Sequence, residues 1–154
     1  MIPFEKSVQE LRVELHRTFP KVVVPLSELA AEGAGDMEEM TIETVLNLDW
    51  SQIPHKEAKG LMDFGRAFTK VGKVAYLPAV LDAILDPKEM DALPLFFAGI
   101  VCALDKSSLS ADQIATVRAV TEFVLSCDEK YENGEFYYDE IWSDREQLLN
   151  WLSD

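Results

Sequence analysis

Histidine and cysteine are scarce in this sequence, and their scarcity restricts the chemistry that it can support. The chain of 154 residues has two histidines and two cysteines, scattered along its length. A zinc site needs several such ligands at short spacings. A nucleophile elbow, a phosphate-binding loop and a dinucleotide fingerprint are also missing from the sequence. We therefore predict no catalytic residue, no metal site and no cofactor.

Basic residues are also few. The chain has 14 lysines and arginines against 28 aspartates and glutamates, which gives a formal net charge of −14. Binding to nucleic acid through phosphates needs clustered lysine and arginine, and an acidic chain is repelled by anionic membrane surfaces. We predict no nucleic-acid partner and no membrane. A strongly acidic surface instead favours a basic protein partner through electrostatic steering.

Long apolar runs and targeting signals are absent too. The longest uncharged run, residues 92–104, is shorter than the roughly 20 apolar residues that span a bilayer. The first residues, MIPFEKSVQEL, lack the basic region and long apolar core of a secretory signal. Cys102 and Cys127 lie at apolar positions of helical patterns, which is typical of reduced, buried thiols, with a disulfide as the alternative. We therefore expect a cytoplasmic protein.

Apolar residues are abundant and recur with helical spacing. They make up 48% of the chain, and its length suits one domain covering residues 1–154. The densest apolar stretch, residues 74–104, predicts two buried helices, with Pro78 in the first turn of the first helix. In that helix Leu77 and Leu81 share the apolar face, while Asp82 and Asp86 lie opposite. We predict an all-α fold, a single compact domain of about six to seven helices around this central hydrophobic helix pair.

Further helices and turns are predicted around this pair. Val8, Leu15 and Phe19 follow a helical stripe in the first segment. Residues 21–24 lie between two prolines and are predicted to be extended, without a strong second strand to pair with. Other signals are a buried turn anchored by Trp50 and Ile53, a turn or cap at Gly72, and a helix opened by a capping box at Ser110 and Gln113.

Three short motifs together resemble a family of small bacterial proteins classed as a domain of unknown function. They are W-x-x-I-P at residues 50–54, Y-L-P-A at residues 76–79 and S-x-x-Q at residues 110–113. The resemblance covers roughly residues 15–131. It implies a single compact domain, and it implies no reaction.

The acidic tail, which we define as residues 128–154, has the strongest compositional signal. It contains nine acidic and two basic residues, half of the net charge, together with six aromatic residues. Aromatic anchors with steering charges are typical of an interface for a basic protein. The function predicted is therefore a non-catalytic acidic cytoplasmic protein that binds a protein partner, for example an immunity-type inhibitor. Alternatively, the aromatics pack inward and the acids form an ordinary solvated surface. The candidate partner-binding residues are Glu132, Glu135, Tyr137, Asp139 and Glu140.

A small enzyme with a site near His55 is the alternative function. His55 follows Pro54 at a predicted helix start, where the helix dipole disfavours the charged imidazole and so favours a neutral base. Asp63 or Tyr76 would be its partner. Ordinary packing beside Trp50 explains the same histidine equally well.

One stretch of the tail partly matches a calcium-binding loop. Asn133, Gly134 and Glu140 occupy the fifth, sixth and twelfth positions of that pattern. Tyr131 stands at the third position and cannot supply the required ligand. We therefore predict a helix end and a solvated acidic loop here, without a metal.

Overall fold

The computed structural model describes residues 3–32, 35–61, 64–86, 100–130 and 145–153, and in these residues it is built from helices. Within this part of the chain there is no β-strand, and a single isolated antiparallel β-bridge joins Ala30 to Phe68. The predicted all-α class is confirmed. In chain order the elements are α1 (Pro3–Thr18), α2 (Leu26–Leu29), α3 (Asp36–Val45), η1 (Trp50–Gln52), η2 (His55–Leu61), α4 (Phe64–Ala67), α5 (Lys70–Ile84), η4 (Lys106–Ser108), α7 (Ala111–Lys130) and α8 (Arg145–Ser153).

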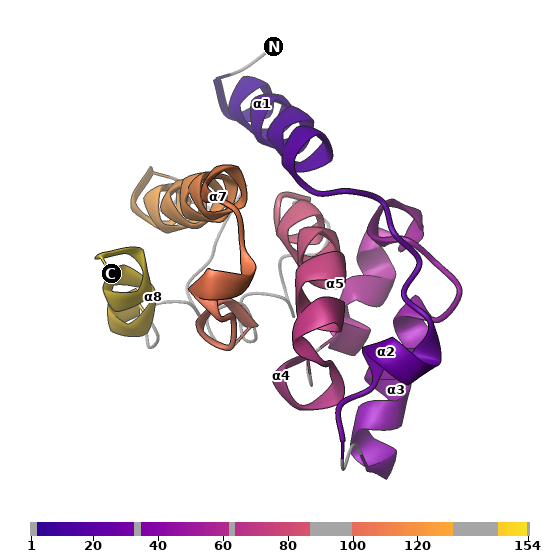
Figure 1. Cartoon of the computed structure of the whole chain (residues 1–154). Helices are drawn as coiled ribbons and strands as arrows, with labels where there is room; N and C mark the ends of the chain where they lie inside the picture. Colours follow the sequence, from indigo (N-terminus) through magenta and orange to yellow (C-terminus); the bar gives the residue numbers. More distant parts are fainter. Residues whose placement is uncertain (1–2, 33–34, 62–63, 87–99, 131–144, 154) are drawn as a thin grey trace.

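Helix α5 is the element on which the others pack. It contacts α1, α2, α7, η1 and η2, and it occupies the middle of the molecule in Figure 1. From Tyr76 to Leu85 its side chains are buried, with Asp82 the half-buried exception. A helix that is apolar on nearly all sides belongs in the centre of a core. The prediction that this segment organises the fold agrees with these contacts.

The start of α5 differs from the prediction. The helix begins at Lys70, because the hydroxyl of Thr69 caps it by accepting a hydrogen bond from the Gly72 amide at 3.2 Å. Pro78 therefore lies inside the helix and not in its first turn, and Gly72 is helical rather than a turn. A proline inside a helix removes one backbone hydrogen bond. The helix continues past Pro78 because the residues around it are buried, and packing contributes more to helix stability than local propensity does.

Gly72 allows α2 to approach α5 closely. A Cβ atom at this position would lie 2.9 Å from Cδ1 and 3.1 Å from the carbonyl oxygen of Leu29. The backbone oxygen cannot move aside as a flexible side chain would. Glycine is therefore favoured at this contact, because any other residue would force the Leu29 backbone to shift by a few tenths of an ångström.

The end of α1 and the turn at η1 are tied together as the sequence predicts. Phe19, Trp50 and Ile53 are buried, and the indole N–H of Trp50 donates to the carbonyl of Phe19 at 3.3 Å. The hydroxyl of Tyr76 donates to the Leu48 carbonyl at 2.8 Å and accepts from the Val24 amide at 3.2 Å. Trp50 and Tyr76 thus bury large apolar bodies while their polar ends remain satisfied.

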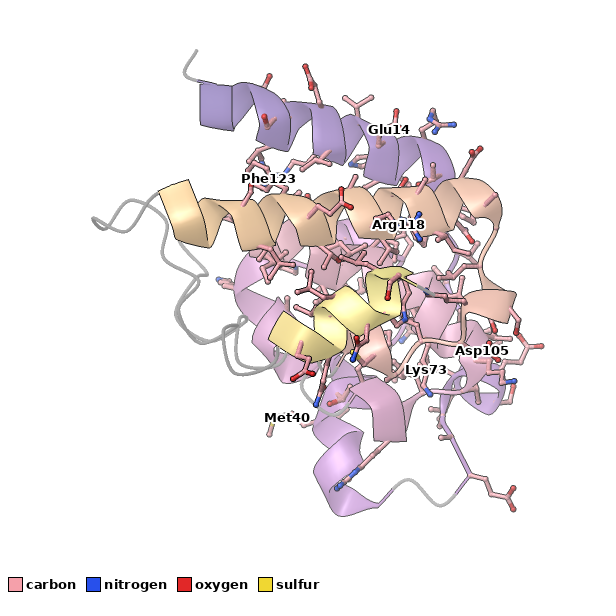
Figure 2. The ribbon with its side chains drawn as sticks, turned by 90° about the vertical axis from the view of Figure 1, so that its left-hand side faces the viewer. Glu14, Met40, Lys73, Asp105, Arg118 and Phe123 are labelled. Atoms are coloured by element: carbon pink, nitrogen blue, oxygen red, sulfur yellow. The ribbon has the colours of Figure 1, made fainter. Side chains whose placement is uncertain are left out.

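Helices α1 and α7 lie side by side and run in opposite directions (Figure 2). The side-chain amide of Gln113 donates to the carbonyl of Thr18 at 3.2 Å, and the hydroxyls of Thr18 and Thr116 are 3.1 Å apart. The predicted capping box is confirmed. Ser110 Oγ accepts from the Gln113 amide at 3.1 Å, and Gln113 Oε1 accepts from the Ser110 amide at 3.0 Å.

Helix α8 is contacted by one long side chain from α7 and one from η4. Arg118 donates to the Leu152 carbonyl at 3.0 Å, and the ammonium of Lys106 lies 4.4 Å from the centre of the Trp151 ring. Trp151 and Leu148 are buried. Of the six tail aromatics, Trp151 is the one whose side chain the structure describes, and it faces the core.

Cys102 is exposed, so the prediction that it is buried is wrong. Successive helical residues are about 100° apart, and Ile100, Val101 and Leu104 take the buried directions. Cys102 therefore points outward despite its apolar neighbours. The side chain of Cys127 lies outside the described residues. So does most of the second member of the predicted helix pair, residues 87–99.

Candidate functional site

Among the described residues, four ionisable side chains are joined by ion pairs, and we name this set the His55 cluster. It comprises Arg12 on α1, His55 at the start of η2, Asp82 in the last turn of α5, and Asp86 just after that helix ends at Ile84. His55 is placed by Pro54, whose carbonyl accepts the first hydrogen bond of η2 from Glu57. The Asp86 amide donates to the Ala83 carbonyl at 3.0 Å, so the turn that ends α5 positions this second carboxylate.

The imidazole of His55 bridges the two aspartates. Its Nε2 atom lies 2.7 Å from Oδ2 of Asp82, and its Nδ1 atom lies 2.8 Å from Oδ2 of Asp86. The guanidinium Nε of Arg12 donates to Oδ1 of Asp82 at 2.9 Å. The exposed fractions of the four side chains lie between 19% and 34%, so solvent screens these charges only in part.

The geometry favours a charged imidazole. A neutral ring has one N–H and one lone pair, whereas here each ring nitrogen faces a carboxylate oxygen. The hydrogen bond to Asp82 raises the pKa of His55 above its ordinary value, against the opposing effect of burial, and the bond to Asp86 adds to the rise. Burial alone would raise the pKa of Asp82. The hydrogen bonds and positive charges of His55 and Arg12 outweigh burial, and the pKa of Asp82 is lowered.

This arrangement is unsuited to general base catalysis. A base needs an unprotonated nitrogen within reach of the substrate, but both nitrogens of His55 are already occupied by carboxylates. The two carboxylates also lie at opposite edges of the ring and do not converge on one point. In the described part of the chain, no group of three or more His, Cys, Asp or Glu side chains is arranged to hold a metal ion. The cluster instead joins α1, η2 and α5 to one another.

The partners proposed for His55 from the sequence differ from those it has. The Tyr76 hydroxyl bonds to Leu48 and Val24 instead, and Asp63 lies outside the described residues. The sequence pattern assigns Asp82 and Asp86 only to the polar side of the central helix. Two carboxylates at the end of an otherwise apolar segment were the signal that could have identified them, because buried charges need partners.

The five candidate partner-binding residues lie outside the described residues. They are Glu132, Glu135, Tyr137, Asp139 and Glu140. The calcium-like stretch lies outside them too, from Tyr131 onward. Within the described elements, no helix combines the length and the apolar character needed to cross a bilayer.

Comparisons with models of protein families, with curated proteins and with solved structures found no match to this chain. Its function must therefore be argued from its own residues.

Proposed function

We propose that this protein is a non-catalytic, acidic, cytoplasmic protein that binds a basic protein partner through its acidic tail, residues 128–154. The observation that carries this proposal is the distribution of charge. Half of the net charge of −14 falls in this one segment, interleaved with aromatic residues. Acidic side chains raise the rate of encounter with a basic surface, and aromatic side chains supply the contact area that slows dissociation.

The chemistry of the His55 cluster supports a binding function over an enzymatic one. His55 is engaged at both nitrogens, at 2.7 and 2.8 Å. The alternative of an enzyme centred on His55 would require one of these contacts to open before each turnover. An inhibitor of a cationic toxin is one specific form of the proposed binding function. Membership of the uncharacterised bacterial family resembled by the three motifs is part of the same proposal, and it assigns no reaction.

The first experiment is the capture of partners from the native host at low and at high salt, followed by measurement of association rates. Reversing Glu132, Glu135 and Asp139 to lysine should slow association and reduce its dependence on salt. Electrostatic steering acts over a Debye length of about 8–10 Å at physiological salt. Tyr137→Ala should instead speed dissociation, because it removes contact area and leaves charge unchanged.

The matched control changes the same amount of charge elsewhere. Glu32, Glu43 and Glu122 are exposed and lie outside the tail, and their reversal to lysine alters the net charge equally. If both triple variants slow association to the same extent, only the overall charge matters and the tail carries no interface. A partner that binds the tail variant at the wild-type rate in low salt would refute the proposal outright.

A further inference from the structure

An apolar groove runs along the amino-terminal half of α5, on a part of the molecule separate from the His55 cluster. It has a volume of about 350 Å³. One wall is the connection between α1 and α2, residues 20–24, and the other is the first turns of α5, residues 70–75; Ser108 of η4 also lines the groove. In Figure 1, α5 lies between the orange η4 turn and the indigo connection that leads to α2. We name this feature the valine groove.

Alternate residues of the connection that forms one wall face the groove. Pro20, Val22 and Val24 line the groove, while Lys21 and Val23 between them do not. Side chains alternate between two faces only when the chain is extended. The extended conformation predicted for residues 21–24 is thereby supported.

This extended chain has unpaired backbone groups. Among the described residues, the amides and carbonyls of Lys21, Val22 and Val23 form no hydrogen bond, whereas the Val24 amide donates to Tyr76. In an extended chain the N–H and C=O groups of neighbouring residues point to opposite edges. Because Val24 points toward Tyr76, the edge of Lys21 and Val23 points the other way. Such an exposed edge is a template on which another chain can pair.

The surface around the groove is apolar and open. Val22 is 46% exposed, Val23 49% and Val71 57%. A small-molecule site usually encloses most of its ligand, and a groove with walls this exposed would leave such a ligand largely in water. The charge of Lys70 at the rim is met by Asp105 at 3.2 Å, so the groove does not select a charged ligand.

From these observations we infer that the valine groove binds an extended, uncharged peptide segment rich in branched apolar residues, added as a strand to the edge of residues 21–23. Strand addition combines main-chain hydrogen bonds with pockets for alternate side chains. The edge of Lys21 and Val23 supplies the hydrogen bonds, and the apolar groove beside it receives the side chains. The surface is distinct in sequence from the acidic tail, so this inference is independent of the proposed function.

The probe for the test is the peptide acetyl-Thr-Val-Thr-Ile-Thr-amide, titrated into the full chain while the methyl signals of the protein are followed by NMR. Shifts should concentrate at Val22, Val24, Val71 and Val74. Two further probes carry N-methyl groups on alternate residues, so that each blocks the donors of one edge of the peptide. One of them should bind about tenfold more weakly and the other should bind like the parent, because a strand pairs through one edge.

Matched variants test the protein side. Val71→Lys at the groove rim should weaken binding of the parent probe about tenfold, since it places a charge where an apolar side chain must dock. Val13→Lys, on α1, is the control. Val13 is 64% exposed and has no part in the groove. Both variants should melt like the wild type, because both sites are exposed.

Three outcomes would overturn the inference. The parent peptide produces no shifts at the groove up to millimolar concentration, or the two N-methylated probes bind equally, or Val13→Lys weakens binding as much as Val71→Lys. A fourth would assign a different occupant. If sedimentation shows that the free protein is a dimer that Val71→Lys dissociates, the groove is covered by a second copy of the chain.

Discussion

The two halves of α5 have opposite surroundings. At its carboxyl-terminal end, Asp82 is paired with Arg12 and His55, and the side chains from Tyr76 to Leu85 are otherwise buried. At its amino-terminal end, residues 70–75 border an open apolar groove whose other wall has unpaired backbone groups. The carboxyl-terminal half is enclosed by the core, and the amino-terminal half borders the groove that we infer to bind a peptide. Each prediction below tests this division.

The largest expected effect comes from truncating the buried half. Leu81→Ala should lower the free energy of unfolding by about 2–5 kcal/mol, because it removes buried methyl groups and leaves a cavity. Val71→Ala in the open half should change it by no more than about 0.5 kcal/mol, since Val71 is 57% exposed. Urea unfolding of both variants measures the contrast. Equal losses would mean that the two halves do not differ as described.

Removal of the His55 ring should be the next largest effect. His55→Ala leaves Asp82 and Asp86 partly buried without their shared donor, and unsatisfied buried groups cost about 1–3 kcal/mol. His16 provides the control, because it is exposed and its ring lies tilted against Trp50, with centroids 4.8 Å apart, without bridging carboxylates. Thermal or urea unfolding of both variants gives the comparison. If His16→Ala costs more than His55→Ala, the His55 cluster is not what holds η2 to α5.

A smaller effect is expected at Gly72, the point in the open half where packing is tight. Gly72→Ala gains about 1 kcal/mol of helix propensity but forces a Cβ within 3.1 Å of the Leu29 carbonyl, and overpacking costs about 1–3 kcal/mol. The net result should be a destabilisation of about 1 kcal/mol. Gly65→Ala is the control, because its Cβ would meet only the Ala103 side chain, at 3.2 Å. A stabilised Gly72→Ala variant would show that α2 moves away without cost.

The pH dependence of stability should be the mildest effect. Because the pKa of His55 is raised above 6.5 in the folded protein, its contribution is complete below about pH 6.5 and declines as the pH rises through the folded value. Because the pKa of Asp82 is lowered below 3.8, its contribution is complete above that pH and declines as the pH falls through the folded value. The cluster therefore stabilises most between these limits.

The measurement for this effect is urea unfolding at about pH 5.5 and about pH 8.5. The wild type should lose stability toward the higher pH, and His55→Gln should lose less, since glutamine does not titrate. An identical loss in both proteins would place the titrating group elsewhere.

The sequence alone predicted the features that depend on neighbouring residues. Helical periodicity marked the stripe of α1, the buried character of α5 and the amphipathic α7, because a 3.6-residue repeat needs no knowledge of the rest of the chain. The capping box of Ser110 and Gln113 could also be predicted from the sequence, since both residues lie within one helical turn. Trp50 and Ile53 could be identified as buried anchors from their size and apolar character.

Tertiary structure decided the remaining features, because they join residues distant in the sequence. His55 meets Asp82 and Asp86 across 27 and 31 positions, and no local pattern selects which carboxylate faces a given imidazole. The start of α5 at Lys70 with Pro78 inside it reflects packing energy that exceeds local propensity. Cys102 points outward because Ile100, Val101 and Leu104 take the core positions. The valine groove exists only because two segments some 50 residues apart, 20–24 and 70–75, are brought together, and a one-dimensional pattern of apolar residues does not specify which of them leave a gap when they pack.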